Sequence, residues 1–248
     1  MMLRQREWLR CAAALAAASA WPLPAAEDEP FDTLDLDWAD TRRQRPVPVR
    51  LYLPQAGQAV PLVVFSHGIG GSRRGYSWLG QHFARHGIAG LHLQHVGSDR
   101  DLWTGSIFSV IGRLQDAAQD SEAIHRAQDL RFALDTLLTS ELAPRVDASR
   151  IVAAGIPGYY SGSQDRVAVF DATGSTRKWL AVFAGGSHSM FTDRSGSGGV
   201  TLNPQVKEAT RALALAFLQT VFDGDDAGLR LWPQRHAAIL ARFSVAGA

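Results

Sequence analysis

The sequence predicts a three-layer α/β fold with a mainly parallel sheet and antiparallel strands at its N-terminal edge. Short apolar runs alternate with helix-like segments through the middle of the chain, which is the element order of a parallel sheet covered by helices on both faces. Two further strand-like segments precede the first helix and predict the antiparallel edge. The 248 residues suffice for one domain with a sizeable core.

Seven segments have the pattern of strands. Pro61–Ser66 is short, continuous and apolar, which is typical of a strand buried on both faces. The alternating segment Phe31–Trp38 is expected at the edge of the sheet. The remaining strands are expected at Val47–Leu53, Ile88–Gln94, Arg150–Ala154, Val167–Phe170 and Trp179–Ala184.

Four segments have helical periodicity. Gly75–His86 is amphipathic and is followed by Gly87, while Asp116–Leu138 carries apolar residues at helical spacing. A third helix is expected to start at Asn203 and Pro204, because asparagine caps helices and proline suits the first helical position. It would run to about Phe222, and the final stretch, Asp225–Phe243, is also expected to be helical.

Residues 1–26 have the three regions of a secretory signal peptide. Basic residues precede an apolar, alanine-rich run, and small residues then precede an acidic segment. The apolar run is shorter than the roughly 20 residues of a membrane span, so the mature chain is expected to lack a transmembrane segment. We therefore predict a secreted or periplasmic protein, with residues 27–248 forming a single domain.

Cleavage would also change the charge and the cysteine content. The leader holds three arginines and one glutamate, so the formal net charge changes from +1 to −1. This balance gives no reason to expect nucleic acid as a partner. The only cysteine, Cys11, leaves with the leader, which excludes disulfides, cysteine-metal sites and a cysteine nucleophile in the mature protein.

The first motif with chemical meaning directly follows the strand Pro61–Ser66 and reads His-Gly-Ile-Gly-Gly at residues 67–71. Glycines let the backbone turn tightly and present N–H groups to a bound carbonyl. We therefore expect the backbone of Gly68 and Ile69 to supply oxyanion donors. A dinucleotide-binding loop is excluded because Arg73 stands where the third glycine would be, and a purely structural turn is the remaining alternative.

The second motif is a histidine loop after the strand Trp179–Ala184. His188 follows Gly185 and Gly186, and this position places it at the carboxyl end of a strand, where ligands collect in open α/β sheets. A neutral imidazole at that edge can act as a general base. The alternative is a loop histidine that only caps a neighbouring group.

Together these residues support a family resemblance. The segment from Pro61 to Asp99, the strand Arg150–Gly155 and the tail from Trp179 onward resemble the dienelactone hydrolase-like and acetylhydrolase-like branch of the α/β-hydrolases, over about residues 30 to 245. The resemblance implies an α/β-hydrolase-type fold. It also implies a Ser-His-Asp esterase or lipase-like hydrolase that acts on carboxylic esters.

The chain departs from this family directly after Gly155. No serine lies in a GxSxG sequence, the strained turn that presents the nucleophile in these enzymes. Only nine residues separate Gly155 from Asp165, fewer than the ten to twelve of a strand-to-strand crossover. We therefore expect a fold truncated in the middle. Asp165 resembles the triad acid, although a solvated loop aspartate is the alternative.

Histidine pairs offer no cofactor or metal site by sequence. His82 and His86 are four apart on a helix, but no third ligand presents itself. His92 and His95 are three apart along a strand and its end, so they are expected on opposite faces. We expect neither a metal nor a cofactor.

The sequence thus predicts an exported ester hydrolase by resemblance, with weak or absent turnover because no nucleophile is identified. Whether the chain is an enzyme stays open at this point. The expected ligand is a small-molecule or lipid-like ester. The alternatives are a non-catalytic protein that keeps the cleft as a binding pocket and the product of an internal gene deletion.

Overall fold

The computed structural model describes residues 29–155, 163–186, 188–191 and 199–246, with the backbone alone described at 163–166, 188–189 and 199–201. The predicted leader, residues 1–26, lies outside these residues. So do residues 156–162, which follow the strand at Gly155.

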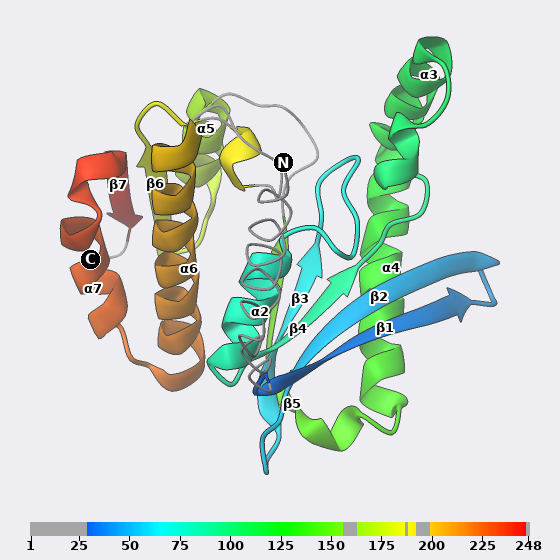
Figure 1. Ribbon diagram of the computed structural model, residues 1–248, viewed down its shortest axis with the longest axis horizontal. Helices are drawn as coiled ribbons and strands as arrows, with labels where there is room; N and C mark the ends of the chain where they lie inside the picture. The colour runs from blue at the N-terminus through cyan, green and yellow to red at the C-terminus, as the bar shows by residue number, and fades with distance from the viewer. Residues whose placement is uncertain (1–28, 156–162, 187, 192–198, 247–248) are drawn as a thin grey trace, which may run out of the picture.

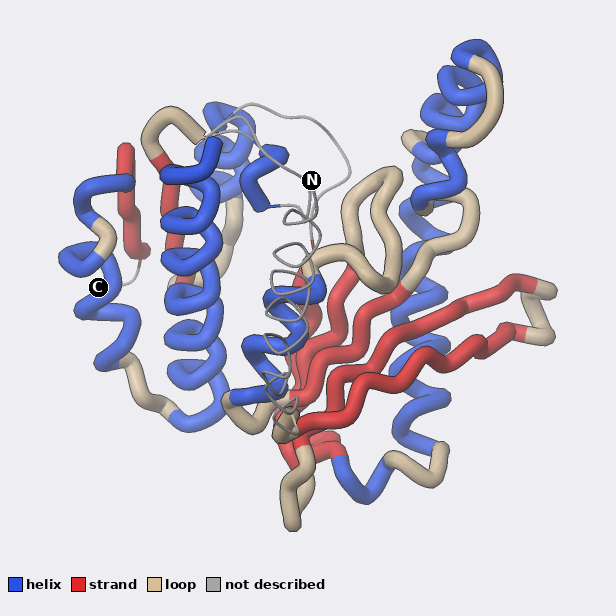
Figure 2. The backbone as a smooth tube through the Cα atoms, in the orientation of Figure 1, coloured by secondary structure: helices blue, strands red, loops and turns tan. Residues whose placement is uncertain are grey.

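A five-stranded mixed sheet forms the centre of the protein (Figures 1 and 2). Its strand order is β1-β2-β4-β3-β5. The pairs β1–β2 and β2–β4 are antiparallel, whereas β3 is parallel to both β4 and β5. Only β2 therefore runs against the other four, which confirms the predicted parallel sheet with an antiparallel N-terminal edge. The strands are β1 (Phe31–Asp40), β2 (Arg45–Pro54), β3 (Val60–Ser66), β4 (Ala89–Leu93) and β5 (Val146–Gly155).

Helices cover both faces of this sheet and make the three layers. On one face, α2 (Ser77–Arg85) and α6 (Gly199–Asp223) pack over Val63 and Phe65 of β3. On the other face, α4 (Asp120–Thr139) packs Ala133 and Leu137 against the central strands. Because both faces are covered, every residue of β4 is buried, as the continuous apolar pattern of this strand requires.

The C-terminal part departs from the predicted elements. The segment Val167–Phe170, predicted as a strand, belongs to the helix α5 (Ser163–Ala172). The predicted strand after it exists as β6 (Lys178–Phe183), but its partner among the described residues is β7 (Leu240–Ala246), in a separate antiparallel sheet. The predicted terminal helix is wrong at its end, because α7 (Ala227–Arg235) and the short η4 (Ala237–Ile239) lead into β7.

Helix boundaries also shift. The predicted helix Asp116–Leu138 is two helices, α3 (Ile107–Ala117) and α4. Ser106 caps α3, which begins nine residues earlier than predicted. Its hydroxyl accepts the Ser109 N–H at 3.3 Å. The helix α6 begins at Gly199 and contains Pro204. Short turns are η1 (Arg100–Trp103), η2 (Ala143–Arg145) and η3 (His188–Phe191).

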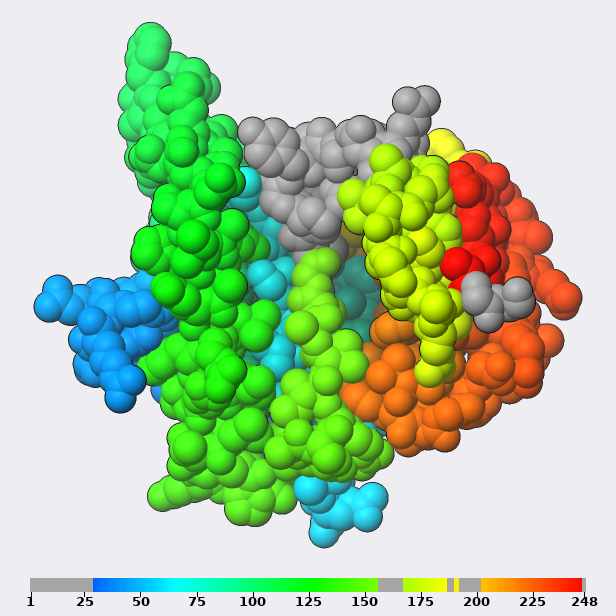
Figure 3. All heavy atoms as spheres, turned by 180° about the vertical axis from the view of Figure 1, so that it is seen from behind, coloured from blue at the N-terminus to red at the C-terminus, as the bar shows by residue number. Residues whose placement is uncertain are grey.

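The edge strand β5 carries the mark of the expected truncation. It pairs with β3, while its other side has no strand among the described residues. Ile151, Val152 and Ala154 are half-buried and Ala153 is exposed, in contrast to the buried residues of β4. Seen from behind, β5 lies open at the surface between α4 and α5 (Figure 3). This agrees with the expected truncation after Gly155.

No helix in the described residues is long and apolar enough to cross a membrane.

Candidate functional site

The glycine loop, residues 67–71, leaves the carboxyl end of β3 and is held against the loop that follows β4. The Gly70 N–H donates to the Ser98 carbonyl at 2.9 Å, and Gly71 forms a parallel bridge with Asp99. Gly70 has a φ of 75°, and the Trp103 indole donates to its carbonyl at 3.1 Å. A side chain at Gly70 would collide with that indole, so glycine is required for both the turn and the close approach.

Two partly exposed residues of this loop have N–H groups that make no hydrogen bond to the described residues. The Gly71 N–H donates to the Gly68 carbonyl at 3.0 Å, and the Gly70 N–H donates to the Ser98 carbonyl. In the part of the chain that the structure describes, the N–H groups of Gly68 and Ile69 have no acceptor. Both residues are partly exposed. The amides predicted as oxyanion donors thus make no hydrogen bond to the described residues, and their role stays a prediction.

His67 fixes the loop from inside. Its Nδ1 donates to the Gly68 carbonyl at 2.6 Å, and its Nε2 accepts the His95 N–H at 3.1 Å. Burial, with the neighbouring His95 as a second cause, lowers the pKa of His67 to about 3. The ring is therefore neutral at physiological pH and acts as a clamp between the loops after β3 and β4.

A Ser-His-Asp arrangement lies beside this clamp. The Ser66 Oγ is 2.9 Å from His95 Nε2, and His95 Nδ1 is 3.1 Å from an Asp129 carboxylate oxygen. Ser66 ends β3, His95 follows β4, and Asp129 lies on α4. Both His95 and Asp129 are fully buried, while Ser66 is half-buried. We call these three residues the relay.

Arginines surround the acid end of the relay. The Arg45 guanidinium donates to both carboxylate oxygens of Asp129, at 2.9 and 3.0 Å, and Arg43 adds a contact at 2.9 Å. Burial pushes the pKa of Asp129 upward, but the hydrogen bonds from His95 and Arg45 hold it below its usual value. Asp129 is therefore ionised, and a carboxylate on Nδ1 keeps that nitrogen protonated.

Arg126 reaches the serine end. Its Nη2 donates to the Ser66 Oγ at 3.0 Å and also to the His67 carbonyl, and its Nη1 donates to the Ser98 hydroxyl at 3.2 Å. Since Arg126 occupies an acceptor position of Ser66, the Ser66 O–H is left to donate to His95 Nε2. Burial lowers the pKa of His95, so its Nε2 is a free base at neutral pH.

The structure does not test the other two predicted catalytic residues. His188 begins η3, directly beyond β6 and its Gly185–Gly186 turn, so its backbone has the predicted place in the chain. Asp165 lies in α5, where a strand-end loop was expected. The side chains of both residues lie outside the described ones, so their roles stay predictions.

Sequence reasoning missed the relay, although it placed His92 and His95 on opposite faces. His92 packs on Phe65 and beneath Gly80 of α2, while His95 faces α4. Asp129 is 34 residues from His95, and no local spacing links them. The available signal was that Ser66 and His95 each stand at the carboxyl end of adjacent parallel strands.

The paired helix histidines do not make a metal centre among the described residues. The His82 and His86 rings are 4.4 Å apart, and His86 Nδ1 donates to the His82 carbonyl. No group of three or more His, Cys, Asp or Glu residues within the described ranges is placed to hold a metal ion.

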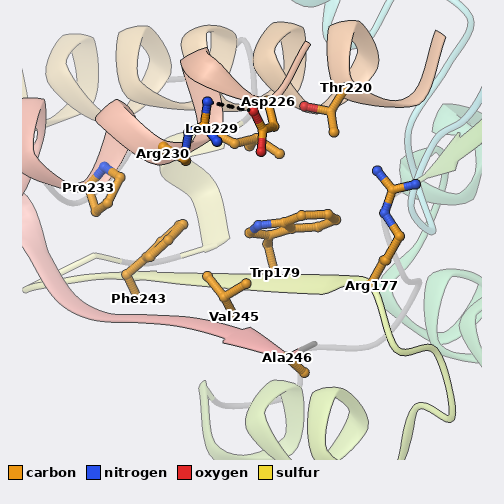
Figure 4. A pocket seen from close by; sticks show the side chains of 10 residues that line it. All are labelled: Arg177, Trp179, Thr220, Asp226, Leu229, Arg230, Pro233, Phe243, Val245 and Ala246. Carbon is orange, nitrogen blue, oxygen red and sulfur yellow. Dashed lines mark ion pairs between the residues drawn. The ribbon is translucent and has the colours of Figure 1, made fainter. Parts of the chain in front are cut away.

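A cavity of about 610 Å³ lies away from the glycine loop, between the β6–β7 sheet and helices α6 and α7. Trp179, Phe243 and Val245 form its apolar floor, and the Asp226–Arg230 ion pair, at 2.9 Å, lies on α7 above them (Figure 4). It includes none of the predicted site residues, so it is separate from the candidate site.

The chain is similar to known hydrolases in sequence and fold. Residues 44–107 match the family model described as platelet-activating factor acetylhydrolase, isoform II. This segment covers β2 to the start of α3, including the glycine loop and His95, but less than half of the chain. No curated protein matches the sequence.

Solved structures extend the similarity to the fold. A ferulic acid esterase from Streptomyces cinnamoneus matches with a TM-score of 0.64 and 19% identity, over 89% of this chain and 97% of that one. A dienelactone hydrolase-like promiscuous phosphotriesterase from metagenomic libraries matches over 51% of this chain and 49% of that one, with a TM-score of 0.39 and 20% identity. The chain therefore has an α/β-hydrolase-type fold and resembles the esterase branch of that superfamily.

Proposed function

We propose that the protein is a slow carboxylic-ester hydrolase. The observation that carries this is the pair of N–H groups at Gly68 and Ile69, which have no acceptor among the described residues and belong to a loop rigidly held by His67 and Ser98. Fixed donors of this kind stabilise the negative oxygen that forms when an ester carbonyl is attacked. The fold and the family-model match point to the same chemistry.

The substrates that fit this proposal are small-molecule or lipid-like esters. On the sequence prediction, His188 is a candidate base and Asp165 a weaker candidate acid, and turnover is slow because the GxSxG turn is absent.

The protein would act outside the cytoplasm after loss of residues 1–26. Expression of the full chain in a bacterium, followed by N-terminal sequencing of the mature form, tests the export; retention of Met1 in the cytoplasmic fraction would contradict it.

The test of function removes one oxyanion donor. Ile69→Pro lacks the N–H at this position, whereas the matched control Ile69→Ala keeps it and loses only the side chain. Loss of one such donor lowers kcat by about 10²- to 10³-fold. Hydrolysis of p-nitrophenyl acetate is measured for the wild type and both variants, with thermal melts to verify folding.

The proposal predicts turnover in the wild type and in Ile69→Ala and its near loss in a folded Ile69→Pro. Turnover equal to the buffer in the wild type would refute it. Equal rates in both variants would show that the Ile69 amide is not an oxyanion donor.

The cavity beside β6 favours a second candidate function, which is binding without catalysis. Its aromatic floor and volume suit an apolar ligand. Saturable binding of a hydrophobic acid, lost in Trp179→Ala, together with no ester turnover would favour this candidate. Binding that is unchanged in Trp179→Ala would exclude this cavity.

A further inference from the structure

We propose that Ser66 is the nucleophile of the protein and that His95 and Asp129 activate it, in place of a serine on the missing GxSxG turn. This inference rests on the proposed ester hydrolysis and assigns the residues that perform it. The sequence marks Ser66 only by its place at the end of a strand, and the family-model match does not assign it a role.

The geometry is that of a nucleophile, base and orienting acid. A serine oxygen 2.9 Å from one imidazole nitrogen, and a carboxylate 3.1 Å from the other, are the contacts that this chemistry requires. The buried Asp129, fixed by Arg45, orients the ring and stabilises its cation. The backbone of His95 is fixed as well, since its N–H donates to His67 Nε2 at 3.1 Å.

The position in the fold also fits. Ser66 is the last residue of β3 and lies next to Gly155 at the end of β5, where a Cβ would come within 3.0 Å of the Ser66 carbonyl. The expected oxyanion donors, Gly68 and Ile69, follow two and three residues later. The serine and the donors thus share one edge of the sheet, the edge where ligands bind in open α/β folds.

Arg126 adds a charge at the reacting oxygen. Its guanidinium donates to the Ser66 Oγ at 3.0 Å. A fixed cation at this distance stabilises negative charge that develops on the serine oxygen or on the attacked carbonyl. Arg126 is itself partly shielded from water, which strengthens such an interaction.

The reaction balances without a co-reactant beyond water. The Ser66 oxygen attacks the ester carbonyl carbon while its proton passes to His95 Nε2. The intermediate collapses as the carbon–alkoxide bond breaks, and His95 returns the proton to the leaving alcohol. Water then attacks the acyl-Ser66 ester with His95 as base, the carboxylic acid leaves, and Ser66 regains its proton.

The burial of Ser66 defines the substrate class. Because the residue is half-buried and its oxygen already contacts Arg126 and His95, we expect only a small acyl group to reach this oxygen. We therefore expect acetyl esters with good leaving groups to react and long-chain acyl esters to react poorly.

The experiment labels the full chain with a biotin-tagged fluorophosphonate and identifies the modified serine by peptide mass spectrometry. Turnover of p-nitrophenyl acetate is measured in parallel for Ser66→Ala, His95→Asn and His188→Ala. Ser140→Ala, at the far end of α4, is the control serine. Circular dichroism melts verify folding, and the label map of the wild type gives an answer that does not depend on any variant.

The proposal predicts the label on Ser66. It also predicts loss of turnover in Ser66→Ala, a decrease of about 10²-fold or more in His95→Asn because a positioned base contributes that much, and no change in Ser140→Ala. Turnover with the label on another serine, or turnover that depends on His188 but not on His95, would overturn the relay and leave ester hydrolysis standing. Absence of both turnover and label would reject the relay and the proposed function together.

Discussion

Buried neutral histidines couple the stability of the protein to pH. Burial lowers the pKa of His67 to about 3 and that of His92 to about 4, whereas both titrate near 6.5 when unfolded. Below pH 6.5 the unfolded chain therefore binds protons that the folded chain does not. The stability that these two histidines contribute is fully present above that pH and should fall by about 3 kcal/mol per pH unit near pH 5.

Urea unfolding at pH 5, 6 and 7 measures this dependence. A His92→Gln variant removes one of these groups and should reduce the slope by about 1 kcal/mol per pH unit, the contribution of one proton. His92 stacks on Phe65 in a fully buried position, so the variant will also be less stable at pH 7. An unchanged slope in this variant would contradict the assignment of a neutral His92.

Among single residues, the sequence pointed to the glycine loop of the candidate site but not to the relay. Gly68 and Ile69 were identified because local spacing after an apolar strand determines a loop. The sequence did not predict that the side chains of Ser66, His95 and Asp129 lie together. Their contact depends on the pairing of β3 with β4 and on the packing of α4. Arg126 was missed for the same reason, since its partners Ser66 and His67 lie 60 and 59 residues away.

The packing of α2 on the sheet depends on one glycine. A Cβ at Gly80 would lie 2.5 Å from the Tyr52 ring and 2.8 Å from His92 Nε2. We expect Gly80→Ala to lower the free energy of unfolding by about 1–3 kcal/mol, since overpacking shifts buried side chains. Thermal or urea unfolding measures the change.

Gly112 of α3 is the matched control for this prediction. It is also helical, but a Cβ there has no neighbour within 4 Å. Gly112→Ala should therefore stabilise by about 0.5–1 kcal/mol, the difference in helix propensity. A stabilised Gly80→Ala would show that α2 does not pack against Tyr52 as described.

Among the helices and strands, the spacing of apolar residues located β1 to β5 and α2, because each of these elements buries one or both faces in the core. It failed at Val167–Phe170, where a four-residue apolar pattern fits a helix as well as a strand. It also failed at Phe243, whose place in β7 depends on pairing with Ala181 of β6. Such pairing is a tertiary contact that no local pattern encodes.

The exposed edge of β5 affects the molecule as a whole. An uncovered strand with free N–H and C=O groups is a template for pairing between chains. Ala153 is exposed on this strand, and Ala153→Lys should reduce aggregation on heating without lowering the melting temperature. Light scattering tests this against Ala172→Lys, which adds the same charge on α5. Equal aggregation in both variants would argue against intermolecular pairing through the edge of β5.

The mass of the intact protein during turnover tests the nucleophilic role of Ser66. The full chain is mixed with p-nitrophenyl acetate, quenched in acid within the first turnovers and weighed by mass spectrometry. If Ser66 is the nucleophile, a fraction of the protein becomes heavier by one acetyl group. This heavier species is absent in Ser66→Ala. Turnover without any acetylated protein, or acetylation that persists in Ser66→Ala, would contradict this role.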